Sequence, residues 1–212
     1  MENKNQFWED AYSKGSMLNK YPFNYLVQIV LKYFGSIQER SDISVLEIGC
    51  GSGNNLHFLA SEGFRVEGFD LSESAIKFAN KRFKKDSLDG ILKVSGFDYL
   101  NNQINKYDMV LERAVFYTQS LDYLKNKVFP NIKRSLKKGG LFISYFYNNN
   151  HPDKTFLKSM DVLSTPTKEE ILELFSDFTI ESITENSTKD IFGKSILGEK
   201  SEYIIIVRKG DE

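Results

Sequence analysis

Apolar residues recur along this chain at two different spacings, and each spacing predicts a different kind of element. Short continuous apolar runs, rich in β-branched and aromatic residues, are typical of strands buried on both faces of a sheet. The run at residues 43–48 is the clearest, because it ends directly in a glycine turn. The predicted strands are residues 43–48, 65–69, 91–95, 107–112, 141–147, 178–184 and 202–207.

Between these strands, apolar residues stand three and four positions apart, which predicts amphipathic helices. One helix precedes all the strands and is expected to stop near Gly35. Ser72 is placed to cap another, and Thr167 with Glu170 forms a capping box. The basic and glycine residues 137–140 are expected to end a helix. The predicted helices are residues 23–34, 54–60, 72–79, 121–136 and 167–174.

The order of these elements predicts the fold class. Strands and helices alternate through most of the chain, which is typical of right-handed crossovers and a mostly parallel sheet with helices on both faces. The last two predicted strands have no clear helix between them, so we expect an antiparallel hairpin at the sheet edge. With 212 residues, one domain is the default expectation.

Residues 45–56 carry the strongest functional signal. Gly49, Gly51 and Gly53 follow a strand and precede a helix, so the main chain there is able to lie close to a bound ligand. The amide groups of the following helix point at the same place. A dinucleotide-binding fingerprint has its third glycine where Asn54 stands, so a nicotinamide-dependent reductase is the weakest interpretation.

With Glu47 two residues ahead of it, this glycine run resembles motif I of the class I S-adenosylmethionine-dependent methyltransferases, E/D-x-G-x-G-x-G. The resemblance implies a Rossmann-like seven-stranded sheet with an antiparallel last strand. It implies S-adenosyl-L-methionine as cofactor, with S-adenosyl-L-homocysteine as product. We expect one methyltransferase domain over residues 1–212: a helical lid at 1–40, a cofactor-binding core at 41–147, and a substrate-side segment with a terminal hairpin at 148–212.

The resemblance also implies residue roles, mostly at the carboxyl ends of strands. Asp70 is expected to accept the ribose hydroxyls, the alternative being a carboxylate that acts on the dipole of the next helix. Asp98 is expected to accept the adenine amino group, the alternative being a turn aspartate. The residues expected at the cofactor are Glu47, Gly49, Cys50, Gly51, Asn54, Asp70, Leu71, Phe97, Asp98, Tyr99, Glu112, Tyr12 and Tyr21.

The fourth predicted strand ends in a segment that resembles the family's motif IV, where the strand-end residue lies beside the transferable methyl group. Many members have Asp or Asn there, but this chain has Glu112 followed by Arg113, so an ion pair between them is an alternative. A general base is needed only for a nucleophile with a proton of high pKa. His151 is a candidate base or substrate ligand, or else a solvated loop histidine. The residues predicted for catalysis are His151, Glu112 and Tyr117.

Composition narrows the function classes. With a net charge of −1, the chain has no excess of basic residues of the kind that binds nucleic acid. No stretch approaches the roughly 20 apolar residues that span a bilayer, and the first residues carry no apolar run, so we expect a cytoplasmic protein without membrane contact. Cys50 is the only cysteine, which rules out an internal disulfide and a cysteine metal cage, and no metal is expected.

The sequence therefore predicts an enzyme that methylates an oxygen or nitrogen of a small molecule, such as a sugar or another metabolite. A macromolecular acceptor, RNA or protein, is a second hypothesis, although the chain lacks the D/N-P-P-Y/F strand end of the exocyclic-amino nucleic-acid methyltransferases. A non-catalytic S-adenosylmethionine-binding protein is a third. Neither the acceptor nor the oligomeric state follows from the sequence.

Overall fold

The computed structural model describes residues 2–188 and 200–210, and the chain folds as two compact units, Met1–Asn102 and Gln103–Glu212. In the first unit, three parallel strands stand in the order β3-β2-β1. They are β1 (Ser44–Ile48), β2 (Arg65–Asp70) and β3 (Ile91–Val94). All five residues of β1 are buried, as a strand covered on both faces requires.

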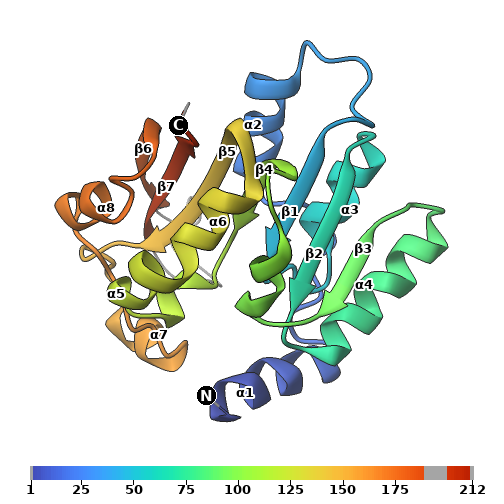
Figure 1. Ribbon diagram of the computed structural model, residues 1–212. Helices are drawn as coiled ribbons and strands as arrows, with labels where there is room; N and C mark the ends of the chain where they lie inside the picture. The colour runs from blue at the N-terminus through green and yellow to red at the C-terminus, as the bar shows by residue number, and fades with distance from the viewer. Residues whose placement is uncertain (1, 189–199, 211–212) are drawn as a thin grey trace. The chain divides into compact units, whose positions relative to one another are not determined.

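Four helices and a short 3₁₀ segment complete this unit (Figure 1). Helices α3 (Asn54–Ser61) and α4 (Glu73–Lys85) follow β1 and β2, and both pack on β2. Helix α1 (Glu2–Ser13) packs on α4, at the end of the sheet to which the arrowheads of β2 and β3 point. Helix α2 is Asn24–Phe34, and the 3₁₀ helix η1 is Phe97–Asn102.

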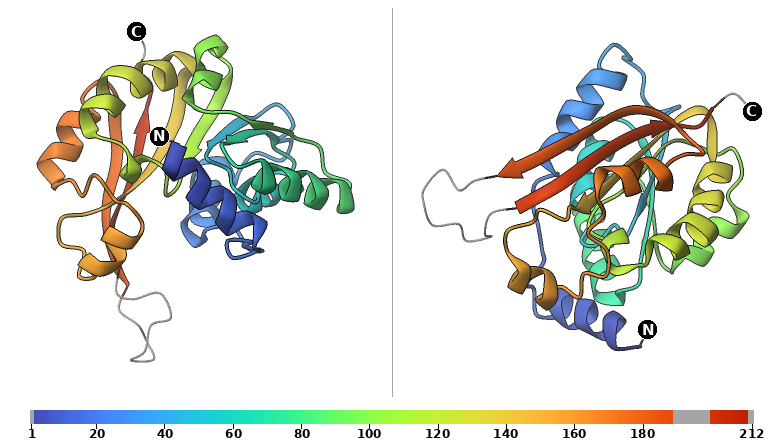
Figure 2. Two further views of the ribbon diagram at one scale, coloured as in Figure 1. Left: turned by 90° about the horizontal axis from the view of Figure 1, so that it is seen from below. Right: turned by 90° about the vertical axis from the view of Figure 1, so that its left-hand side faces the viewer.

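Four strands of the second unit stand in the order β4-β5-β7-β6. β4 (Tyr107–Glu112) and β5 (Leu136–Tyr147) are parallel, whereas β7 (Lys200–Arg208) is antiparallel both to β5 and to β6 (Thr179–Thr188). The long β6–β7 pair is plain in Figure 2. All seven predicted strands are present, and the α/β class with an antiparallel last strand is confirmed.

Helical segments of the second unit depart from the prediction in two places. The expected helix at 121–136 is α5 (Leu121–Tyr123), then a π-helical segment η3 (Leu124–Val128), then α6 (Phe129–Ser135). Pro130 lacks an N–H for the carbonyl four residues earlier, which accounts for a wider turn just before it. α7 (Lys154–Ser159) was not predicted; η2 is Phe116–Thr118 and α8 is Lys168–Leu174.

Residues 137–140, expected to end the helix, lie instead in a bulged start of β5. Tyr107 pairs with Leu136 and Met109 with Leu141, so the register shifts between the two pairs. Gly139 has a φ of +70° in this bulge, a conformation that favours glycine. The capping predictions are confirmed, because Ser72 Oγ accepts from Ala75 N and Thr167 and Glu170 form a reciprocal capping box.

The core of the second unit is rich in phenylalanine. Phe129 lies with its ring centroid 4.8 Å from that of Phe175, 5.4 Å from Phe142 and 5.6 Å from Phe116. Such tilted and edge-on pairs hold α6, β5 and the segment after β4 together. They fix the carboxyl ends of β4 and β5, which carry the polar residues described below.

Candidate functional site

The glycine loop of the first unit has a backbone that few other residues tolerate. Gly49, Gly51 and Gly53 have φ values of +66°, +50° and +73°. A Cβ on Gly53 would lie 2.9 Å from the Cβ of Ala79, so this glycine lets α4 approach closely. A Cβ on Gly51 would lie 2.2 Å from the hydroxyl oxygen of Tyr12, which places the Tyr12 phenol directly on the loop. The loop is thus bare main chain covered by one tyrosine.

Asp70 ties this loop to the start of α4. Its Oδ2 accepts a hydrogen bond of 2.9 Å from Gly51 N, and its Oδ1 accepts one of 2.9 Å from Ser72 N. Burial raises the pKa of the Asp70 carboxyl, against the lowering effect of the Ser72 and Gly51 amides. Each carboxylate oxygen has a second lone pair, so a neighbouring diol finds two acceptors already in a fixed orientation.

Glu47 and Asn55 join the loop to the segment before α2. Glu47 is 2% exposed, and its Oε1 accepts from Asn55 Nδ2 at 2.7 Å. Asn55 Oδ1 in turn accepts from Phe23 N at 2.9 Å, and Asn54 Nδ2 donates to the carbonyl of Tyr21 at 2.9 Å. The Tyr21 side chain is 73% exposed, so this residue meets the loop through its main chain.

Leu71, Gly96 and Asp98 lie together beside β2 and β3. A Cβ on Gly96 would stand 3.1 Å from Asp98 Oδ1 and 3.5 Å from Leu71 Cδ2, so an apolar side chain and a carboxylate both lie beside Gly96. Leu71 is 54% exposed, so part of its apolar side chain is open to a ligand. Tyr99 is committed to β2 instead, with its ring 5.1 Å from Phe69 and its hydroxyl donating to Glu67 Oε2 at 3.0 Å.

Helix α1 is held on this site by Glu9, a residue that the sequence did not single out. Glu9 Oε2 accepts from Ser72 Oγ at 2.7 Å and from Ser74 N at 3.2 Å, and Oε1 accepts from Ser74 Oγ. Hydrogen bonds from the Ser72 and Ser74 hydroxyls lower the pKa of the Glu9 carboxyl. The anion also lies at the positive end of α4. Through this contact α1 carries Tyr12 onto the loop.

Cys50 and His57 are the other chemically reactive residues near the loop. Their surroundings indicate a structural role for both. Cys50 is 3% exposed, and burial, with Glu47 and Asp70 nearby, raises the pKa of its thiol well above the ordinary value. It is therefore an inert small residue rather than a nucleophile. His57 Nε2 is 2.7 Å from Asp86 Oδ2, and its ring packs edge-on against Phe83.

In the second unit, Glu112 is fully buried at the end of β4. Its Oε1 accepts from Ser144 Oγ at 2.7 Å and from Tyr145 N at 2.8 Å, and its Oε2 accepts from Val115 N at 3.2 Å and Phe116 N at 3.4 Å. Burial raises the pKa of this carboxyl to about 7, against the lowering effect of these four donors. Glu112 thus fixes β4 to β5 and to the following turn.

Tyr117, Tyr147 and His151 form a row near Glu112. The Tyr117 and Tyr147 ring centroids are 5.1 Å apart, and those of Tyr147 and His151 are 5.0 Å apart. His151 is 1% exposed, and its Nδ1 accepts a hydrogen bond of 3.2 Å from Asp153 N. His151 is therefore a buried residue, and the alternative of a solvated loop histidine is wrong. Ala114 lies between Glu112 and Tyr117 in the sequence and has a φ of +66°. The chain therefore turns sharply after β4.

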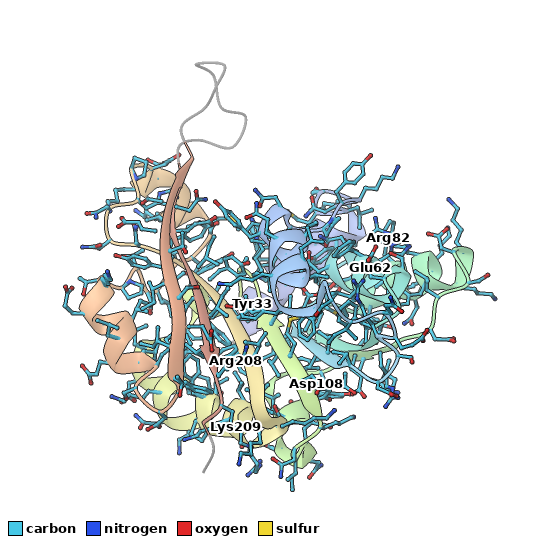
Figure 3. All side chains as sticks on the ribbon, turned by 90° about the horizontal axis from the view of Figure 1, so that it is seen from above. Tyr33, Glu62, Arg82, Asp108, Arg208 and Lys209 are labelled. Atoms are coloured by element: carbon cyan, nitrogen blue, oxygen red, sulfur yellow. The ribbon has the colours of Figure 1, made fainter. Side chains whose placement is uncertain are left out.

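A separate cavity of about 310 Å³ lies at the opposite end of these strands, beside the last residues of β7. Phe129, Phe178, Lys133 and Lys209 are among the residues that line it. Figure 3 labels Lys209, which comes directly after β7. In open α/β sheets ligands bind at the carboxyl ends of the strands, so this cavity is not the candidate site.

Among residues 2–188 and 200–210, the structure brings no three histidine, cysteine or acidic side chains together in a cluster fit for a metal ion. Over the same residues, no helix has the length and apolar character that crossing a bilayer demands. The candidate cofactor site of the first unit is thus made of main-chain amides, carboxylates and aromatic rings. The second unit, taken by itself, has a separate group of buried polar residues at the ends of β4 and β5, which includes Glu112 and Tyr117.

Residues 39–199 match a family model described as a methyltransferase domain. A Geobacillus sp. (strain WCH70) protein named as a methyltransferase is 25% identical over 181 residues, which cover 80% of this chain and 68% of that protein. The 18S rRNA (guanine(1575)-N(7))-methyltransferase of Saccharomyces cerevisiae is 28% identical over 123 residues, 50% of this chain and 41% of that enzyme. The chain spans less than half the length of several further curated relatives.

A solved structure with the same fold is the 1,6-didemethyltoxoflavin-N1-methyltransferase of Burkholderia thailandensis with bound S-adenosylhomocysteine. It aligns with a TM-score of 0.74 and 16% identity, over 98% of this chain and 87% of that chain. At this identity the likeness shows the fold, and it confirms the Rossmann-like architecture predicted from the order of strands and helices.

Proposed function

The chain belongs to the methyltransferase-domain family and is an S-adenosyl-L-methionine-dependent methyltransferase, and on that basis we propose that it methylates an oxygen or nitrogen of a small molecule. One observation carries the cofactor assignment: Asp70 is held by Gly51 N and Ser72 N at the carboxyl end of β2, next to a loop of three glycines with positive φ. That is the geometry a nucleoside ligand needs.

The residues of the first unit fit an adenosyl sulfonium. Asp70 offers two oriented oxygens to the ribose diol, and Asp98 offers a carboxylate beside the exposed face of Leu71, where an adenine ring with its amino group fits. Gly49 and Gly51, both with positive φ, leave the main chain of the loop without side chains that would keep a ligand away from it. When bound, S-adenosyl-L-methionine supplies a methyl group on a positively charged sulfur.

The chain's own contribution is binding, orientation and exclusion of water. Tyr12, carried by α1, covers the loop with an aromatic ring, a group that attracts a sulfonium and keeps water away from it. Glu47, with one oxygen on Asn55, is a buried carboxylate next to the loop and suits the ammonium of a methionine group. Holding nucleophile, methyl carbon and sulfur in line is the main task in such a displacement.

A labelled-methyl transfer assay tests the proposal. Methyl-labelled S-adenosyl-L-methionine is incubated with the protein and three separate pools: small metabolites, total RNA and total protein. We expect label in the small-metabolite pool. Label confined to RNA or to protein would establish a macromolecular acceptor instead, and cofactor binding without turnover in any pool would favour a non-catalytic binding protein. The Asp70→Ala variant, prepared in parallel, controls for contaminating enzymes.

A further inference from the structure

The cavity beside the last residues of β7, all within the second unit, has an apolar wall. Phe129, Leu174 and Phe178 line it and are buried, and Pro130 completes this side. The rings of Phe129 and Phe178 stand edge to face, with centroids 6.2 Å apart and an angle of 84° between their planes. Because both rings belong to the phenylalanine core of this unit, the wall is held in place and suits a flat apolar body.

The polar residues that line the same cavity are mainly basic. They are Lys125, Lys133, Arg134 and Lys209, with Asp177 as the one acidic residue among the described lining residues. Lys125 is already paired, because its Nζ lies 2.9 Å from Glu173 Oε1. Lys133 and Asp177 form no ion pair within the part of the chain that the structure describes. The lining therefore carries an excess of positive charge that the protein itself does not neutralise.

Two of these lysines share one end of α6. Lys209 Nζ donates to Asn105 Oδ1 at 2.8 Å and to the carbonyl of Leu136 at 2.7 Å, and both acceptors are neutral. Lys133 lies in the last turn of α6, three positions before Leu136. Burial lowers the pKa of the Lys209 ammonium, and the positive charge of Lys133 lowers it further. A negative charge bound beside both lysines would relieve their repulsion.

An apolar wall beside uncompensated basic groups defines the chemistry of a ligand. We propose that this cavity binds a small aromatic anion, with its ring against Phe129 and Phe178 and its negative charge beside Lys133 and Lys209. The volume of about 310 Å³ lies at the lower end of the range for small-molecule pockets, about 300–1,000 Å³. Nucleic acids and acidic proteins bind basic residues spread over a face or along a helix, whereas these residues stand around one cavity.

The proposed anion site is separate from the carboxyl ends of the strands in this unit. Lys209 directly follows β7, whose Arg208 pairs with Leu141 in the first half of β5. Its partner Asn105 comes just before β4, so the cavity lies at the amino ends of β4 and β5. The six residues of β4 put about 20 Å between its two ends. The anion is therefore an additional ligand, and its binding does not depend on the proposed function.

Two-dimensional NMR of the full chain locates the site. The probe 2-naphthoate, its neutral isostere 2-naphthamide, and acetate are titrated separately while the amide signals are followed. We expect naphthoate to shift the signals of Phe129, Lys133 and Phe178, with a dissociation constant of about 1 mM or lower. Naphthamide, which lacks the charge, should bind at least about fivefold more weakly. Acetate, which lacks the apolar body, should shift none of these signals at the same concentration.

A pair of matched lysine variants tests the charge. Lys133→Gln removes the positive charge and keeps most of the side-chain stem, and it should weaken naphthoate binding at least about fivefold while leaving naphthamide binding unchanged. Lys127→Gln is the control, because Lys127 is an exposed lysine of the preceding η3 segment and does not line the cavity. It should leave the affinity for both ligands unchanged. Equal naphthoate affinity in the two variants overturns the inference.

Melting temperatures without ligand separate this role from a structural one, since a cation in the last turn of a helix also stabilises its carbonyl end. Lys133→Gln should melt at the same temperature as the parent chain or higher, because the repulsion with Lys209 is removed. A melting temperature clearly below that of Lys127→Gln would assign Lys133 to the fold and overturn the inference. Naphthoate shifts at residues 49–53 instead of the cavity would overturn it too. So would a hexaglutamate peptide that shifts the cavity signals at lower concentration than naphthoate does, which would indicate an acidic protein as partner.

Discussion

Adding one methyl group at Gly51 tests the packing of α1 on the glycine loop. Gly51 has a φ of +50°, and a Cβ there would lie 2.2 Å from the Tyr12 hydroxyl oxygen and 3.1 Å from Tyr12 Cζ. Gly51→Ala therefore carries two separate costs. One is the left-handed backbone, about 1–2 kcal/mol for an L-residue. The other is the displacement of the Tyr12 ring from the loop.

Gly139 supplies a control for the first cost alone. It has a φ of +70°, and a Cβ there would find nothing within 4 Å. Gly139→Ala should lower the free energy of unfolding by the backbone cost of about 1–2 kcal/mol and leave affinity for S-adenosyl-L-homocysteine unchanged. Gly51→Ala should lower the free energy of unfolding further and weaken that affinity at least about 30-fold, or about 2 kcal/mol.

Urea unfolding and isothermal calorimetry measure the two effects, and a double variant separates them. Replacing Tyr12 as well, in Gly51→Ala/Tyr12→Ala, removes the steric conflict. Relative to Tyr12→Ala alone, the added alanine should then cost no more unfolding free energy than Gly139→Ala does. If Gly51→Ala matches Gly139→Ala both in unfolding and in ligand affinity, Tyr12 does not lie on the loop and the reasoning is refuted.

Three further predictions concern single side chains. Asp98→Ala should weaken binding of S-adenosyl-L-homocysteine about tenfold in calorimetry, so that it binds no more tightly than the S-inosyl analogue, which lacks the adenine amino group. If the variant loses the same affinity for both ligands, Asp98 does not contact the amino group. Burial in the folded state raises the pKa of Glu112 to about 7, so the protein should lose on the order of 3 kcal/mol of unfolding free energy as the pH rises from the unfolded pKa near 4.5 through 7. Urea titrations at several pH values measure this loss, and Glu112→Gln should make the unfolding free energy less dependent on pH. The same pH dependence in the variant would contradict the prediction. Glu9→Ala should speed amide hydrogen exchange in α1, whereas unaltered exchange there would show that the Ser72 and Ser74 contacts do not hold the helix.

The parts of the site that could be predicted are those fixed by local backbone requirements. Three glycines between a strand and a helix signal positive φ, and Gly49, Gly51 and Gly53 all have it. Asp70 follows from its spacing, because the carboxyl end of a neighbouring parallel strand must lie beside the loop. The capping serine and threonine follow from the same local rules.

The parts that could not be predicted depend on contacts between distant residues. Glu9 meets Ser72 across 63 positions of sequence, and no local pattern marks that pair. Within residues 2–188 and 200–210 the Tyr117 hydroxyl has no hydrogen-bond partner, and this depends on all the residues packed around it. Residues 137–140 were expected to end a helix, because lysine followed by glycine is typical of that; pairing of β5 with β4 and β7 instead extends the strand through them.

Calorimetric titration of the full chain with S-adenosyl-L-homocysteine, next to the Asp70→Ala variant, tests the central claim most directly. One equivalent should bind with micromolar affinity, or about 8 kcal/mol, and the variant should lose at least about 2 kcal/mol of that. Binding that is unaffected by Asp70→Ala would contradict the account, and so would binding of a nicotinamide dinucleotide without binding of S-adenosyl-L-homocysteine.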